Sequence, residues 1–89
     1  MKIKDGFALR SFDDQFIVVT VTDHTATDFN RLIKLNKTAA FIWRQLEKET
    51  DRQAVLRAIQ TQYSVDEITA KKDLERLLQT LSRAGLLEL

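Results

Sequence analysis

Two segments near the start of the chain alternate apolar and polar positions in the manner of β-strands. Residues 7–12 (FALRSF) predict one strand, and residues 16–22 (FIVVTVT) predict a second that is rich in β-branched side chains, which suit a pleated surface. The polar residues 13–15 (DDQ) between them favour a hairpin turn. The chain is therefore expected to begin with an antiparallel pair of strands.

A third, shorter strand is expected over residues 31–35 (RLIKL). Ile33 and Leu35 share one face of it, because side chains alternate along a strand. We expect that face to point into the core. The polar residues 23–30 (DHTATDFN) that precede this strand are expected to form a loop or the end of a long hairpin.

From Asn36 onward the spacing of apolar residues changes from two to three or four, which predicts helices. Asn36 is a suitable N-cap, because its side chain can accept a hydrogen bond from the free amides of a first turn. The first helix is expected over residues 37–48, with an apolar stripe made of Ala39, Ile42, Trp43 and Leu46.

Two further helices are expected over residues 51–62 and 65–84. Each has capping-box spacing at its start, in residues 50–53 (TDRQ) and 64–67 (SVDE). Their apolar faces consist of Val55, Leu56 and Ile59 in the second helix, and of Ala70, Leu74, Leu77, Leu78 and Leu81 in the third.

Strands come first and helices second, which predicts an α+β fold. We expect a winged-helix-like arrangement, with a three-stranded antiparallel sheet followed by three helices on one face of it. Gly85 stands where a glycine ends a helix, and residues 86–89 (LLEL) are expected to pack on the core as a short apolar tail. The chain has 89 residues, no proline and no internal repeat, so residues 1–89 are expected to form one domain.

Residues that could support catalysis are sparse. The chain has no cysteine, its single histidine, His24, falls in the expected loop, and Gly6 and Gly85 are its only glycines. Zinc sites draw on several Cys, His or carboxylate ligands at regular spacing, a nucleophilic Ser or Thr needs a base partner, and phosphate-cradling loops need glycines. The sequence therefore predicts a protein that is not an enzyme and carries no metal or cofactor.

Charge and hydropathy narrow the classes of partner. The formal net charge is +1, and acidic Asp73 and Glu75 interrupt the basic residues of the third helix. A nucleic-acid binder would more often show a basic excess and a recognition helix rich in Arg, Lys, Asn and Gln. Residues 1–6 are not followed by an apolar run, so we expect no signal peptide. No apolar stretch of the sequence is long enough to span a bilayer. We expect a cytoplasmic protein that binds neither nucleic acid nor membrane.

The short third strand is open to two interpretations. Arg31 and Lys34 flank its apolar residues, and natural sheets often carry lysine on an edge to prevent unwanted pairing. The alternative is that this edge accepts a strand from a partner peptide, which is the β-augmentation mode of recognition. An amphipathic helix beside the edge would then form the second wall of a groove.

The strand-to-helix segment 33–43 (IKLNKTAAFIW) resembles the signature of the PQQ biosynthesis protein D (PqqD) family. Residues 63–67 (YSVDE), 70–74 (AKKDL) and 84–87 (AGLL) are similar to the third helix and the close of the same family. The resemblance runs from about residue 7 to residue 87, nearly the whole chain. It is a pattern of linked segments, so it is more specific to the fold than to one pathway.

The resemblance implies a non-catalytic adaptor, a recognition element for ribosomally made and post-translationally modified peptides. Such a domain holds the leader segment of a precursor peptide as an added strand on the third strand, against the third helix, and delivers it to a modifying enzyme, often a radical-SAM enzyme or a leader peptidase. Carried over to this sequence, the peptide-binding residues would be Arg31, Leu32, Ile33, Lys34, Lys71, Asp73, Leu74 and Leu78.

Which flank of the third helix faces the strand stays open, because Lys71 and Leu78 lie on one side of the apolar stripe and Asp73 and Leu77 on the other. The basic residues Arg31, Lys34 and Lys71 favour an acidic leader. A winged-helix nucleic-acid binder and a structural dimerisation module remain the alternatives, and the protein is expected to be a monomer or a weak homodimer.

Overall fold

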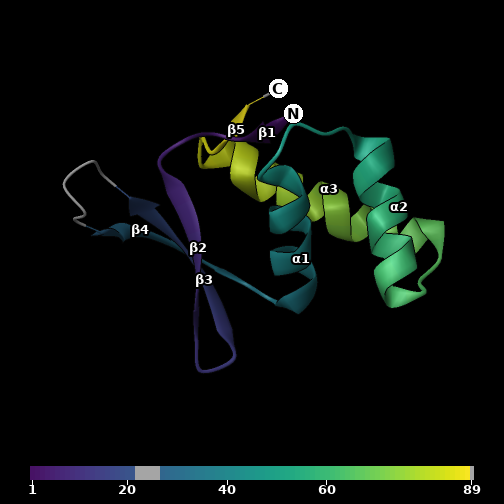
Figure 1. Cartoon of the computed structure of the whole chain (residues 1–89), viewed down its shortest axis with the longest axis horizontal. Coiled ribbons are helices and arrows are strands. Elements are labelled where there is room, and N and C mark those ends of the chain that lie inside the picture. The colour runs from purple at the N-terminus through teal and green to yellow at the C-terminus, as the bar shows by residue number, and fades with distance from the viewer. Residues whose placement is uncertain (22–26, 89) are drawn as a thin grey trace.

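The computed structural model describes residues 1–21 and 27–88, except for the side chains of residues 27–32. It confirms the predicted fold class, with a three-stranded antiparallel sheet and three helices in a small α+β arrangement (Figure 1). The elements in chain order are β1 (Lys2–Ile3), β2 (Phe7–Phe12), β3 (Gln15–Val21), β4 (Thr27–Leu35), α1 (Lys37–Leu46), α2 (Arg52–Tyr63), α3 (Glu67–Arg83) and β5 (Leu87–Glu88).

β2 and β3 form the expected hairpin, with Phe12 paired to Gln15 across a two-residue turn. Both turn residues have positive backbone φ angles, 44° at Asp13 and 67° at Asp14. This conformation matches the turn type whose twist suits the two flanking strands, and aspartate tolerates it better than most residues. The polar break in the sequence therefore becomes the tightest hairpin connection.

β4 is longer than predicted, because it starts at Thr27 rather than at residue 31. Thr27 and Asp28 pair with Val21 and Thr20 of β3. This pairing holds the start of a polar stretch, which was expected to be a loop or hairpin end, in a strand conformation. Tertiary pairing overrides local propensity here. His24, which was expected in the same loop, lies outside the described residues.

An irregularity divides β4. Val18 pairs with Ile33 and Thr20 with Asp28, so a two-residue step on β3 faces a five-residue step on β4. From Ile33 to Leu35 the pairing with β3 is regular. Ile33 shares the core face with Val18 and Leu9. The predicted inward direction of Ile33 and Leu35 is confirmed, since both pack in or against the core.

The helices begin at side-chain caps. The Asn36 side chain accepts a hydrogen bond from the Ala39 amide at 2.8 Å, as predicted. The caps of α2 and α3 are Asp51 and Asp66, one and two residues later than the Thr50 and Ser64 that the spacing indicated. A carboxylate at those positions caps as well as a hydroxyl does, and Ser64 instead ends α2 in the left-handed conformation.

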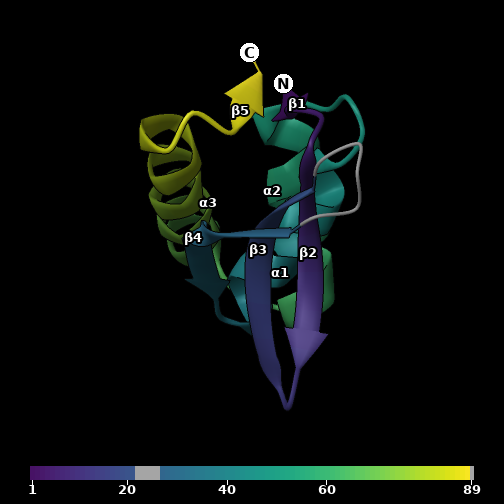
Figure 2. The same ribbon diagram turned by 90° about the vertical axis from the view of Figure 1, so that its left-hand side faces the viewer.

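The three helices cover one face of the sheet, and their apolar stripes meet in a single core (Figures 1 and 2). Its largest fully buried side chains include Trp43 and Leu46 of α1, Ile59 of α2 and Leu74 of α3. All five apolar residues predicted for α3 are buried. No helix in the described part of the chain is both long and apolar enough to cross a bilayer.

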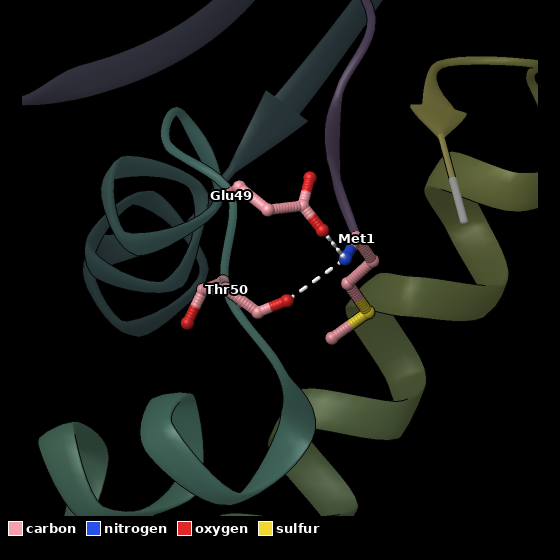
Figure 3. Close-up of polar contacts among 3 residues, drawn as sticks. All are labelled: Met1, Glu49 and Thr50. Atoms are coloured by element: carbon pink, nitrogen blue, oxygen red, sulfur yellow. Dashed lines mark hydrogen bonds and ion pairs between the residues drawn. The ribbon is translucent and has the colours of Figure 1, made fainter.

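The two ends of the chain lie side by side (Figure 1). β1 pairs with β5 in a separate two-stranded ribbon, so the segment expected to be an apolar tail is partly a strand. The Met1 amino group donates to Glu49 Oε1 at 2.6 Å and to the Thr50 carbonyl at 2.8 Å (Figure 3). These contacts fasten β1 to the segment between α1 and α2.

Gly85 closes α3. Its φ is +77°, its amide donates to the Ser82 carbonyl, and the Leu86 amide donates to the Leu81 carbonyl at 2.9 Å. These two hydrogen bonds, together with a residue in the left-handed conformation, form the Schellman motif. It turns the chain so that Leu86, 2% exposed, returns to the core.

Gly85→Ala is expected to lower the free energy of unfolding by about 1–2 kcal/mol, because an L side chain is strained at this φ. Open space surrounds the position, so the loss comes from the backbone and not from a clash. Asn tolerates the conformation better, so Gly85→Asn should fall between glycine and alanine in urea denaturation. An alanine variant as stable as the glycine protein would contradict the assignment of this cap.

The Asp66 carboxylate accepts a hydrogen bond from the Thr69 amide at 2.7 Å. This backbone hydrogen bond, with a smaller contribution from the Thr69 side chain, lowers the pKa of Asp66 below its usual value. A lowered folded-state pKa gives stability that is present above the unfolded pKa and is lost as the pH falls through the folded value.

Asp66→Asn keeps a cap but removes the titration. Melting temperatures followed from pH 7 down to about pH 2 should therefore decline less steeply for this variant than for the unsubstituted protein below about pH 4. Parallel curves for the two proteins would show that the cap does not contribute to the acid response.

Candidate functional site

β4 forms one edge of the sheet. The strand order is β2-β3-β4, so β4 is bonded to β3 on one side, and on its other side it faces α3 (Figure 2). Peptide groups on the outer side of an edge strand have no ladder partner within the sheet. The geometry therefore places an unpaired strand edge opposite the longest helix of the protein.

A hollow of about 210 Å³ lies where the end of β4, the start of α1 and the middle of α3 meet. Its apolar lining is formed by Leu35, Ala39 and Leu77. Leu35 and Leu77 also belong to the core, so the base of the hollow is continuous with the hydrophobic interior. The remaining lining residues are polar or charged, and they are Lys34, Asn36, Thr38, Asp73, Arg76 and Thr80.

The lining residues of α3 follow from helical spacing. Asp73, Arg76, Leu77 and Thr80 are three or four residues apart, which places them on one flank of the helix. The opposite side of the apolar stripe, which carries Lys71, does not line the hollow. The sequence did not decide between two flanks of this helix. The flank that lines the hollow is the one that bears Asp73 and Leu77.

The predicted site residues are distributed over several environments. Lys34 and Asp73 line the hollow. Ile33 is half-buried against the core, and Leu74 and Leu78 are buried in it. Lys71 is exposed on another part of α3, where it approaches Glu67 at 3.7 Å. The backbones of Arg31 and Leu32 belong to β4, and their side chains are outside the described part.

Several lining residues were absent from the predicted site. They are Leu35 at the end of β4, Asn36, Thr38 and Ala39 at the start of α1, and Arg76, Leu77 and Thr80 on α3. The signal for the α3 residues was present, because they follow Asp73 at helical spacing. The contribution of α1 could not be inferred without knowing how its first turn sits relative to α3.

Two ion pairs in the described part of the chain involve residues of α3. Glu67 pairs with Lys71, and Glu75 accepts from Arg52 Nε at 2.8 Å. Among the described residues, Lys34, Asp73 and Arg76 take part in no ion pair within 4 Å. The charges that line the hollow therefore have no ion-pair partner in the described part of the chain, and Lys72 and Arg83 elsewhere on α3 have none either.

The described residues bring no three His, Cys, Asp or Glu side chains together as metal ligands. What they do bring together is an unpaired strand edge, a small apolar base and a helix flank with charges of both signs. An extended segment could add to such an edge and place its side chains between strand and helix.

Comparisons with known proteins bear on this geometry. The family model described as coenzyme PQQ synthesis protein D (PqqD) matches residues 18–87, which include β4, α1, α2 and α3. A solved structure described as TbiB1 in complex with the TbiA(beta) leader peptide is similar over 99% of this chain and 95% of that one, with a TM-score of 0.73 and 28% identity. No curated protein matches the sequence significantly.

Proposed function

The chain belongs to the family of coenzyme PQQ synthesis protein D, and on this premise we propose that it binds the leader segment of a ribosomally made precursor peptide. The observation that carries the proposal is the unpaired edge of β4 facing α3, with a hollow between them. A structurally similar protein, TbiB1, has been solved with a leader peptide bound.

The leader binds by strand addition. Its backbone pairs with the outer edge of β4, which supplies affinity largely independent of sequence, and its side chains supply selectivity. The regular end of β4, at Ile33 and Lys34, is the part nearest the hollow. A leader strand there would continue the sheet from β3 through β4 towards α3.

The hollow suits side chains of a peptide better than a whole small molecule. Its volume of about 210 Å³ is below the ~300–1,000 Å³ of usual small-molecule pockets. Leu35, Ala39 and Leu77 offer an apolar base for one or two leader side chains. A leader that orders only on binding loses part of the interaction energy as entropy, so affinities in the micromolar to sub-micromolar range are expected, roughly −8 to −10 kcal/mol.

The protein acts as a non-catalytic adaptor in this proposal, and residues 1–89 work as one peptide-recognition domain. By holding the leader, it presents the rest of the precursor to a modifying enzyme, either a radical-SAM enzyme or a leader peptidase. Strand addition leaves the remainder of the precursor free to reach such an enzyme. This division of labour requires binding residues and a groove, but no nucleophile or metal in the adaptor.

The binding mode can be tested without knowing the natural precursor. A display library of random 12-residue peptides is selected against the protein, and enriched peptides are synthesised and measured by fluorescence polarisation. The TbiA(beta) leader peptide and a duplex DNA of mixed sequence serve as further probes. The proposal expects peptide binding that competes for one site, and it expects no competition from the DNA.

Thr80→Trp is expected to weaken the selected peptides by at least tenfold, because the indole would fill the hollow that Thr80 lines. Thr80 is exposed, so the variant should fold normally. Gln79→Trp is the matched control, since Gln79 is also exposed, at the preceding position of α3, but does not line the hollow. Equal affinity of the two variants would place the binding site elsewhere, and duplex DNA binding that Thr80→Trp removes would favour a nucleic-acid partner.

A further inference from the structure

The groove between β4 and α3 carries three charges that have no ion-pair partner among the described residues. Asp73 and Arg76 lie on the groove flank of α3, and Lys34 lies on β4 across from them. In the described chain none of the three has an ion-pair partner. Lys72 and Arg83 of α3 are also without one, but they do not line the hollow. Both signs are present at the hollow, with two cations and one anion.

A peptide lying in the groove would remove water from these groups. Covering a charge without a counter-charge or hydrogen-bond partner costs free energy, and the cost is larger for a charge than for a neutral polar group. A leader that is only acidic would satisfy Lys34 and Arg76 but would set a carboxylate against Asp73. The acidic leader expected from the basic residues of the sequence is therefore an incomplete description of the ligand.

Resting on the proposed function, we infer that the bound segment carries charges of both signs, a carboxylate that pairs with Arg76 and Lys34 and a basic side chain that pairs with Asp73. Arg, with its planar fork of donors, is the residue best suited to a carboxylate, and the Arg76 guanidinium can bind a ligand carboxylate in two hydrogen bonds.

The spacing of the two charges on the ligand follows from helix and strand geometry. Asp73 and Arg76 are three residues apart, which is about 4.5 Å along a helix axis. An extended peptide advances about 3.3 Å per residue. The acidic and the basic residue are therefore expected within about three positions of each other in the leader.

Selection of the 12-residue display library against charge variants tests this inference. The unsubstituted protein is expected to enrich peptides with an acidic and a basic residue at this spacing. Arg76→Glu should lose the acidic preference and Asp73→Lys the basic one. The double variant Asp73→Lys/Arg76→Glu should favour peptides with the two charges exchanged, binding them at least tenfold more tightly than the parent peptides.

Lys72→Glu is the control, because Lys72 is exposed on α3 and does not line the hollow. Its selected peptides should match those of the unsubstituted protein. Arg76 and Lys72 are exposed and Asp73 is half-buried. Circular dichroism melting verifies that each variant folds.

The outcomes separate the two proposals. If every charge variant enriches the same peptides and Thr80→Trp still abolishes their binding, the charge inference is wrong and peptide binding at the groove stands. If no peptide is enriched on the unsubstituted protein, the proposed function fails and the inference falls with it. If Lys72→Glu alters the selected peptides as much as Arg76→Glu does, the charge preference does not come from the hollow and the inference is wrong.

Discussion

The burial of the apolar stripe of α3 determines how the rest of this small protein is arranged. Leu74, Leu77, Leu78 and Leu81 are each less than 5% exposed and pack in one core with Trp43. Truncating a buried leucine to alanine costs about 2–5 kcal/mol, while a chain of 89 residues has a total stability of roughly 4–13 kcal/mol. The rotation of α3 about its axis is therefore fixed, and with it the choice of residues that face β4.

The edge strand owes its position to the same packing. β4 is held on one side by β3 and at its end by Leu35, which is 8% exposed and reaches the core. Its outer side faces α3 without a strand between them (Figure 2). An open edge is a liability for aggregation, and Lys34 is the kind of residue that limits it. An edge left unpaired despite the risk of unwanted pairing is what strand addition by a partner peptide requires.

The sequence predicted much of this fold because the periods of its apolar residues are unambiguous. The helix stripes and the inward direction of Ile33 and Leu35 followed from spacing alone. The expectation of a loop or hairpin end over residues 27–30 was wrong, because these residues belong to β4 and Thr27 and Asp28 pair with β3. The flank of α3 at the groove could not be predicted, since Leu77 and Leu78 are both buried, and only the position of β4 distinguishes their sides.

Hydrogen exchange at the amides of β4, measured by NMR with and without a saturating selected peptide, tests strand addition most directly. The account predicts that amides on the outer edge of β4 near Ile33 and Lys34 exchange more slowly in the complex, at alternate residues, because each gains a backbone partner from the peptide. Unchanged exchange throughout β4, with the peptide demonstrably bound, would contradict the account.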